Sequence, residues 1–405
     1  MQQQELKRDF LATRRSKLIT EEDLELFLEK IEIHISNKKI LVIGGAGSIG
    51  SSFIDEIAKY LPKTIHIIDQ NENGLTNVVR NIRSNDSKIS NINLVTSPLD
   101  FGSKTTEQFI LDNGAYDAVY NFAAIKHVRS EKDIYSLMQM FDTNVLKHSK
   151  LIDFLIKNNL TSRYFSVSTD KTANPVSLMG ASKKLMELVL NCKHLKNETS
   201  IETSSTRFPN VAFSNGSLLH SFPIRYEKRE PIPSPIDIER YFISHAEAAQ
   251  ICLLASIGLN EANILVPKIN SNFEIYPIID VAKNFILSKN LTPVIVESKD
   301  AGYEIIKNGK NEYPILATKP DTTGEKEYEE FVGNNENIIK SNFKNFDVVE
   351  SSSFNIEKLQ QFLANLEGML SGEINISKKI LVDEISEIVP SFSHVETGIN
   401  LDSRM

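Results

Sequence analysis

Residues 39–57 read KILVIGGAGSIGSSFIDEI, an apolar run followed by a glycine-rich turn and a stretch that can continue as a helix. The apolar run predicts a buried strand, and the turn repeats glycine in a GxxGxxG pattern. Glycine permits positive φ and lets backbone N–H groups approach a pyrophosphate seated at a helix N-terminus. The segment therefore predicts a dinucleotide site. Its expected cofactor-binding residues are Gly44, Gly47, Ser48, Ile49 and Gly50.

The alternation of an apolar run with a helical stretch continues from Lys39 to about residue 215. This order is typical of βαβ units, in which right-handed crossover helices join parallel strands. We expect an α/β fold with a Rossmann-type doubly wound parallel sheet, in which residues 38–215 form the dinucleotide-binding domain and carry the catalytic segment. The later strands are expected at TIHII (64–68), INLVT (92–96), DAVYNF (117–122), RYFSVS (163–168) and IETSSTRF (201–208).

The segments on either side of this domain are less regular. Residues 1–37 predict a helical extension, because Thr20 and the acidic residues after it can cap a helix with one apolar face. That helix can pack on its own domain or on another subunit, and the sequence leaves both open. Beyond residue 215 the alternation fades, so we expect residues 216–405 to form a smaller C-terminal α/β substrate-binding part, which can share sheet strands with the larger domain.

The composition predicts a folded protein of the cytoplasm, with 41% hydrophobic and 24% charged residues and no apolar run long enough for a signal peptide or a membrane span. A net charge of −8 argues against nucleic acid as a partner. Cys192 and Cys252 form no CxxC pair and the eight histidines show no close metal-ligand spacing, so we expect no metal site.

Two aspartates close the second and third predicted strands. Asp69 ends TIHIID, where a carboxylate would accept hydrogen bonds from both adenosine ribose hydroxyls and repel a 2′-phosphate. NAD is therefore the expected cofactor in preference to NADP, although Asp69 can also be a turn residue only. Asp100 ends the next strand, where an acid in this fold commonly faces the adenine.

Four further stretches are informative in combination: GGAGSIG (44–50), NFAAIKHV (121–128), VSTDKTANPVSLMGASK (167–183) and TRFPNVAFSNGS (206–217). Together they resemble the extended short-chain dehydrogenase/reductase superfamily and, within it, the UDP-N-acetylglucosamine 4,6-dehydratases of polysaccharide biosynthesis. RYF (240–242) and DTTGEKEYEEF (321–331) add weaker echoes.

This resemblance implies a nucleotide-sugar dehydratase, which is a lyase, for surface glycan biosynthesis. It would convert UDP-N-acetylglucosamine to a UDP-4-keto-6-deoxy sugar by C4 oxidation, loss of water across C5 and C6, and hydride return to C6. The resemblance also implies a homo-oligomer, since such enzymes commonly pair through a four-helix interface.

The catalytic residues follow from the same resemblance. The superfamily places a Tyr four residues before a Lys, and here Met179 and Lys183 occupy these positions, so the usual base is missing. The elimination is assigned to Asp170 and Lys171: a free amine removes the C5 hydrogen that the C4 ketone acidifies, and a neutral acid protonates the leaving hydroxyl. We expect Lys183 and the oxidised nicotinamide to lower the pKa of Lys171, and desolvation to keep Asp170 protonated. Thr169, helped by Lys183, is the candidate to relay the C4 hydroxyl proton.

The remaining expected site residues also come from the resemblance, and Asn144 among them supports architecture more than chemistry. Further cofactor contacts are expected from Ala123, Ala124, Lys126, Asn144, Lys183 and Phe208. Substrate contacts are expected from Lys126, His127, Met179, Asn210, Ser217 and Arg240, of which the last offers a planar fork suited to phosphate oxygens.

Two other functions remain open at this point. A nucleotide-sugar epimerase on the same fold also oxidises its substrate but releases no water. A scaffold or regulator would keep the NAD site and have lost catalysis when Tyr became Met.

Overall fold

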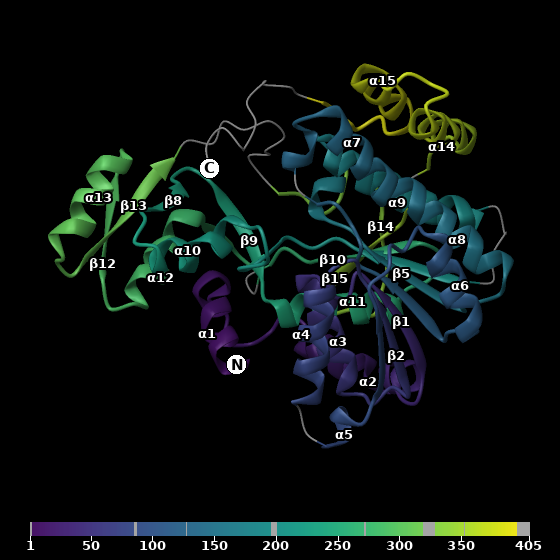
Figure 1. Ribbon diagram of the computed structural model, residues 1–405, viewed down its shortest axis with the longest axis horizontal. Helices are drawn as coiled ribbons and strands as arrows, with labels where there is room; N and C mark the ends of the chain where they lie inside the picture. The colour runs from purple at the N-terminus through teal and green to yellow at the C-terminus, as the bar shows by residue number, and fades with distance from the viewer. Residues whose placement is uncertain are drawn as a thin grey trace.

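The computed structural model describes residues 2–84, 87–126, 128–195, 201–270, 273–318, 329–351 and 353–394. Within these residues the main sheet has nine strands in the order β14-β15-β10-β6-β5-β4-β1-β2-β3 (Figure 1). Strands β1 to β6 and β10 run parallel, whereas β15 and β14 add an antiparallel edge. The expected doubly wound parallel sheet is confirmed. The strands are β1 Lys39–Ile43, β2 Thr64–Ile68, β3 Asn93–Ser97, β4 Ala118–Asn121, β5 Arg163–Val167, β6 Glu202–Thr206, β10 Asn263–Pro267, β14 Ile338–Ile339 and β15 Phe346–Val349.

Helices cover both faces of this sheet because successive strand side chains point to opposite faces. In β1, Ile40 and Val42 belong to the apolar cluster on one face, and Leu41 and Ile43 belong to the cluster on the other. The first cluster contains α2 Glu21–Ile35, α3 Ser48–Ala58, α4 Glu72–Arg83 and α11 His245–Gly258. The second contains α6 Lys104–Asn113, α7 Ile134–Phe141, α8 Lys147–Lys157 and α9 Leu178–Leu195. The short α5 is Ser87–Ser90.

A smaller lobe lies beside the carboxyl ends of the parallel strands (Figure 1). It contains two three-stranded sheets, β11-β9-β7 and β12-β13-β8, and an apolar core of its own that includes Phe222, Phe242 and Phe285. Its strands are β7 Asn210–Val211, β8 Ile232–Pro235, β9 Glu239–Ile243, β11 Ile275–Pro277, β12 Thr292–Val296 and β13 Glu312–Thr318. Its helices are α10 Leu218–Glu227, α12 Ile278–Leu287 and α13 Lys299–Asn308. Because β10, β14 and β15 return to the main sheet, the chain beyond residue 215 contributes to both parts.

The N-terminal helices pack on the same chain. Helix α1, Gln2–Thr13, contributes Ala12 to the core of the smaller lobe, while α2 buries Phe27 and Ile31 with the main-sheet helices. Thr20 precedes α2 as expected but does not cap it, because its hydroxyl donates instead to Gln250 Oε1 of α11 at 2.5 Å. Arg15 joins the two parts. Its Nη2 atom donates to the Phe242 carbonyl of β9 at 3.0 Å and to both carboxylate oxygens of Glu247, at the start of α11, at 2.8 and 3.0 Å.

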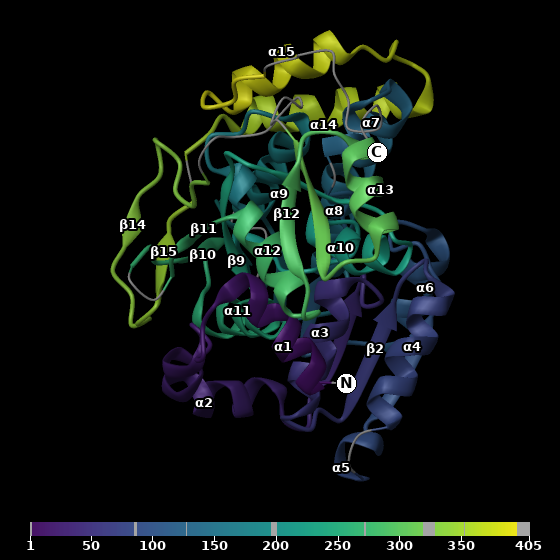
Figure 2. The same ribbon diagram turned by 90° about the vertical axis from the view of Figure 1, so that its left-hand side faces the viewer.

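The last two helices form an additional layer outside α7 and α9 (Figures 1 and 2). They are α14 Ile356–Ser371 and α15 Lys378–Ile388. Leu359, Phe362 and Leu366 of α14 are buried in the apolar cluster that contains α8 and α9, and the Phe362 ring lies 6.1 Å from that of Phe141. In the described part of the chain no helix combines the length and apolar character needed to cross a lipid bilayer.

Two leucines of α14 test how strongly this layer is attached. Leu366 is 0% exposed and Leu370, one turn later, is 40% exposed. Leu366→Ala should lower the free energy of unfolding by about 2–5 kcal/mol, because it removes apolar contacts and leaves a cavity. The matched change Leu370→Ala should alter it by less than about 0.5 kcal/mol. Urea unfolding of both variants measures the difference, and equal effects would show that α14 does not pack as described.

Candidate active site

The glycine-rich turn at the end of β1 lies against the end of β4. Gly44 has φ +74°, and a Cβ atom placed on it would lie 2.5 Å from the backbone nitrogen of Ala123. A Cβ atom on Gly50 would lie 2.3 Å from the carbonyl oxygen of Gly44. The first turn of α3 can therefore lie this close to the end of β1 only because residue 50 is a glycine. Gly47 precedes α3 with φ −71°, so of the three glycines only Gly44 uses positive φ. A close backbone turn ending in a free helix N-terminus fits the pyrophosphate of a dinucleotide.

Other expected residues of this turn have contacts within the chain. Ser48 is the first residue of α3, and its hydroxyl accepts a hydrogen bond from the backbone N–H of Asn215 at 3.1 Å. Ile49 is half-buried against the main apolar cluster. The Ser48 contact links the glycine-rich turn to the segment that leads into the smaller lobe.

The two strand-end aspartates have different environments. Asp69 accepts hydrogen bonds from the backbone N–H groups of Ala46 at 2.9 Å and Asn71 at 2.8 Å, which places its carboxylate beside the glycine-rich turn. Asp100 forms an ion pair of 2.6 Å with Lys147 of α8. Burial alone would raise the pKa of Asp100, but the hydrogen bond and charge of Lys147 lower it. Contacts of either aspartate with the adenosine remain predictions.

Asn144 fixes the segment after β4. Its amide exchanges two 2.9 Å hydrogen bonds with the backbone of Ile125 and donates a third, of 3.0 Å, to Ser182 of α9. Asn144 lies in a π-helical turn, Asp142–Leu146, between α7 and α8. Its side chain therefore positions the segment containing Ala123 and Ala124, which are both half-buried. Lys126 is exposed beyond them, and His127 lies outside the described residues.

Asp170 and Lys171 lie in a short helical turn, Asp170–Thr172, directly after β5. Lys171 Nζ lies 3.2 Å from Asp170 Oδ1, and the Thr169 hydroxyl donates to the same oxygen at 2.6 Å. Asp170 is 3% exposed. Burial alone would lower the pKa of Lys171, but the charges of Asp170 and Glu329 raise it. The lowered pKa expected for Lys171 is therefore not found in this structure, because its near neighbours are carboxyl groups.

Lys183 has the opposite environment. It lies one turn after Met179 on α9, is 4% exposed, and its Nζ atom is 3.1 Å from the sulfur of Met186. Burial lowers the pKa of Lys183 to about 8. Met179 is 2% exposed in the apolar cluster around α7 and α9, so its expected substrate contact remains a prediction.

The expected substrate residues beyond β6 gather around a carboxyl group that the sequence analysis missed. Asn210 Nδ2 donates to Glu329 Oε1, the backbone N–H of Tyr241 donates to Glu329 Oε2 at 3.1 Å, and Arg240 Nε lies 3.4 Å from Oε1. Burial and the charge of Asp170 raise the pKa of Glu329 to about 8. Its position could not be inferred because 119 residues separate it from Asn210. Two other expected residues lie apart from this group: Phe208 is buried in the main cluster, and Ser217 caps α10.

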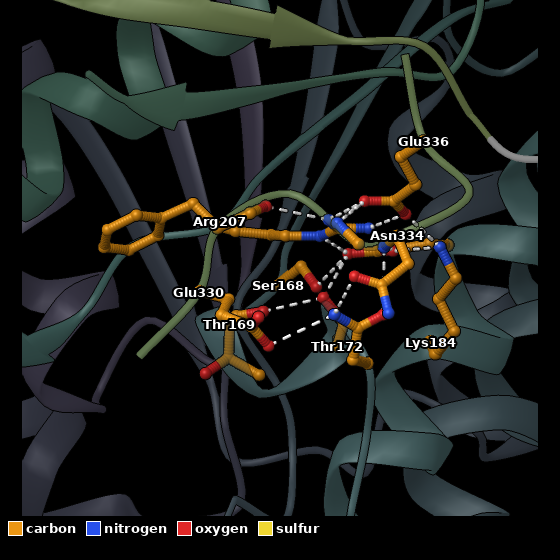
Figure 3. A network of polar contacts seen from close by, with 12 residues as sticks. Ser168, Thr169, Thr172, Lys184, Arg207, Glu330, Asn334 and Glu336 are labelled. Atoms are coloured by element: carbon orange, nitrogen blue, oxygen red, sulfur yellow. Dashed lines mark hydrogen bonds and ion pairs between the residues drawn. The ribbon is translucent and has the colours of Figure 1, made fainter. Parts of the chain in front are cut away.

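A buried network of charges holds the segment around Glu329 against the main sheet (Figure 3). Arg207, which is 0% exposed, donates to both oxygens of Glu187 at 2.8 and 2.6 Å and to both oxygens of Glu336 at 2.6 and 2.7 Å. The hydroxyls of Ser168 and Thr172 donate to Glu187 at 2.5 and 3.0 Å. The end of β5, helix α9 and residues 331–336 are therefore joined by one network.

The charge of Arg207 can be tested by removal. Burial alone would raise the pKa of Glu187 and Glu336, but Arg207 and Lys184 lower it, so their carboxylates contribute stability above their unfolded pKa values and lose it as the pH falls. At pH 7, Arg207→Met should lower the free energy of unfolding by about 3–5 kcal/mol, because two buried carboxylates lose their partner.

The control is Arg225→Met, which breaks the more exposed pair with Glu230. It should cost less than about 1 kcal/mol. Denaturant unfolding of both variants provides the measurement, and a small effect of Arg207→Met would contradict the network.

The family model described as polysaccharide biosynthesis protein matches residues 40–351. The chain belongs to this family. Its expected place in the polysaccharide-biosynthesis group of extended short-chain dehydrogenases is therefore confirmed.

Three curated proteins that are similar to this chain carry different names. The capsular polysaccharide biosynthesis protein CapD of Staphylococcus aureus is 28% identical over 330 residues, which are 80% of this chain and 52% of CapD. The UDP-glucose 4-epimerase of Rickettsia rickettsii is 24% identical over 89% of this chain and 97% of its own. The UDP-N-acetylglucosamine 4,6-dehydratase (inverting) of Campylobacter jejuni is 27% identical over 58% of this chain and 68% of its own. The chain thus spans about half the length of CapD.

Solved structures show the same fold. The X-ray structure of Pen from Bacillus thuringiensis superposes with a TM-score of 0.63 at 18% identity and covers 82% of this chain and 98% of that protein. At this identity the likeness concerns the fold. The roles of the individual site residues in this family member remain predictions.

Proposed function

We propose that the chain is an NAD-dependent nucleotide-sugar 4,6-dehydratase that acts on UDP-N-acetylglucosamine in surface polysaccharide biosynthesis. The observation that carries the proposal is the Asp170–Lys171 pair at the carboxyl end of β5. Strands β5, β4 and β1 are neighbours in a parallel sheet, so the pair shares one sheet edge with the glycine-rich turn. Ligands of open α/β sheets bind along this edge. NAD, when bound there, would accept a hydride from C4 and return it to C6.

The ion pair of this structure can become the reactive pair by moving one proton. Transfer from the Lys171 ammonium to the Asp170 carboxylate, 3.2 Å away, gives a free amine and a carboxylic acid without exchange with solvent. A bound sugar that excludes water favours this transfer, because desolvation penalises the charged forms. Lys171 then takes the C5 proton, the C6–O bond breaks, and the leaving hydroxyl takes the Asp170 proton as water. Both residues return to their charged forms.

The C4 hydroxyl proton requires a separate path, because Met179 occupies the position of the usual Tyr. Thr169 directly precedes Asp170 in the chain, and its hydroxyl donates a hydrogen bond to Asp170 Oδ1 at 2.6 Å. With its pKa lowered to about 8, Lys183 is a free amine in a fraction of the molecules near neutral pH, and that fraction can accept a proton relayed by Thr169.

We propose residues 38–215 as the cofactor-binding and catalytic domain, with residues 1–37 as an extension and residues 216–405 supplying most of the substrate side. A cytoplasmic location and a homo-oligomer belong to the same proposal.

The cofactor can be tested at Asp69. Asp69→Asn should lower the preference for NAD over NADP by about tenfold, because the repulsion of a 2′-phosphate is lost. Titration of the protein with each dinucleotide measures this preference. The control Asp112→Asn, on the exposed face of α6, should leave it unchanged, and an unaltered preference in Asp69→Asn would place the ribose elsewhere.

The reaction can be tested by mass. Incubation with UDP-N-acetylglucosamine should give a product lighter by one water, and Lys171→Met should slow its formation by at least about 100-fold, because the base is lost. Lys150→Met, at an exposed lysine of α8, is the matched control and should keep full activity.

An epimerase is the second candidate, favoured by the relative of Rickettsia rickettsii, which is named UDP-glucose 4-epimerase and matches 89% of the chain. It would yield an isomer of unchanged mass. A scaffold or regulator would bind NAD but turn over no nucleotide sugar and would be indifferent to Lys171→Met.

A further inference from the structure

Three hydrogen-bond donors of different kinds converge on the carboxyl group of Glu329. They are the Asn210 amide, the Arg240 guanidinium and the backbone N–H of Tyr241, which we call the oxyanion cradle. The cradle is built by β7 and β9, which pair in parallel with Asn210 opposite Phe242. Its donors are therefore held by strand register, and together they form a site for an anion.

The carboxyl group in this cradle is a weak occupant. Glu329 is 8% exposed, and the groups that face it are Asp170 and Lys171 from the end of β5 and Arg240 and Tyr241 from β9. Burial and the negative charge of Asp170 disfavour the ionised form of Glu329. The positive charges of Lys171 and Arg240 offset this effect only in part, so the pKa of Glu329 rises to about 8. A phosphate oxygen keeps its negative charge at neutral pH, so it is the stronger ligand for the same donors.

The backbone next to Glu329 is held in place by contacts with the main domain. Residues 331–336 are tied to Arg207 through the Phe331 carbonyl at 2.9 Å and the Glu336 carboxylate. Glu330 accepts a 3.1 Å hydrogen bond from Asn174. Because the segment is anchored on the C-terminal side of Glu329, we expect the Glu329 side chain rather than the backbone to move when the cradle is emptied.

Asn210 and Arg240 are the residues already expected to contact the substrate phosphate, and we propose that Glu329 is the intramolecular competitor for these donors, which a nucleoside diphosphate displaces. This inference rests on the proposed nucleotide-sugar function and adds to it the residue that decides which anions enter. A free sugar carries no anionic group that could replace the Glu329 carboxyl group on these donors. Glu329 thereby selects phosphorylated sugars over free ones.

The experiment is a titration of the full chain, with NAD present, by UDP at pH 7 and pH 9. In the wild-type protein the Kd should rise by up to about tenfold between these values, because Glu329 ionises through its pKa and competes more strongly. Glu329→Gln removes the ionisable competitor, so its Kd should be nearly independent of pH and about tenfold lower than that of wild type at pH 9. Glu330→Gln, the same change at the next residue and outside the cradle, should behave as wild type.

Arg240→Met distinguishes the competitor role of Glu329 from the proposed nucleotide-sugar function. It should weaken UDP binding at both pH values, because a cradle donor is lost, while NAD binding is retained. If Arg240→Met weakens UDP binding but Glu329→Gln neither tightens it nor removes its pH dependence, the competitor role is overturned and the nucleotide-sugar function stands. If no variant binds UDP although NAD binds, both are overturned.

Discussion

The guanidinium of Arg207 is fully buried, and the arrangement of the site depends on how its charge is balanced. An unpaired cation in this position would cost several kcal/mol, so two carboxylates must reach it. Glu187 belongs to α9, and Glu336 lies 129 residues after Arg207 in the chain. Glu187 also accepts hydrogen bonds from the hydroxyls of Ser168 and Thr172. The carboxylate that balances the charge of Arg207 therefore also holds the residues on either side of Asp170 and Lys171 in the chain.

Two lysines near this network show how position decides protonation. Lys171 has Asp170 and Glu329 as neighbours and is held as a cation, whereas Lys183 has a thioether as its nearest partner and tends to lose its proton. In the proposed reaction the ion pair of Asp170 and Lys171 is the resting form. The reactive forms are expected only when a bound substrate excludes water from the pair.

The sequence could predict the sheet and the residues at its strand ends because both depend on local pattern. The glycine spacing, each apolar run and the aspartate after β2 involve only a few consecutive residues. The apolar runs form the strands, and the glycine-rich turn and Asp69 lie together at one edge of the sheet. Contacts between distant segments could not be predicted: Glu329 and Glu336 reach the site across more than 100 residues. The environment of Lys171 was missed for the same reason, since its pKa depends on a carboxyl group whose position only the folded chain reveals.

The layer formed by α14 and α15 gives α9 an unusual setting for a helix that carries a candidate catalytic lysine. The sheet lies on one side of α9 and α14 on the other, and most of its residues are buried, including Lys183 and Lys184. A helix enclosed on both sides offers little of its surface to water. The helix that carries Lys183 is thus packed in part by the final described helices, so the C-terminal segment helps to hold the position of α9 in the fold.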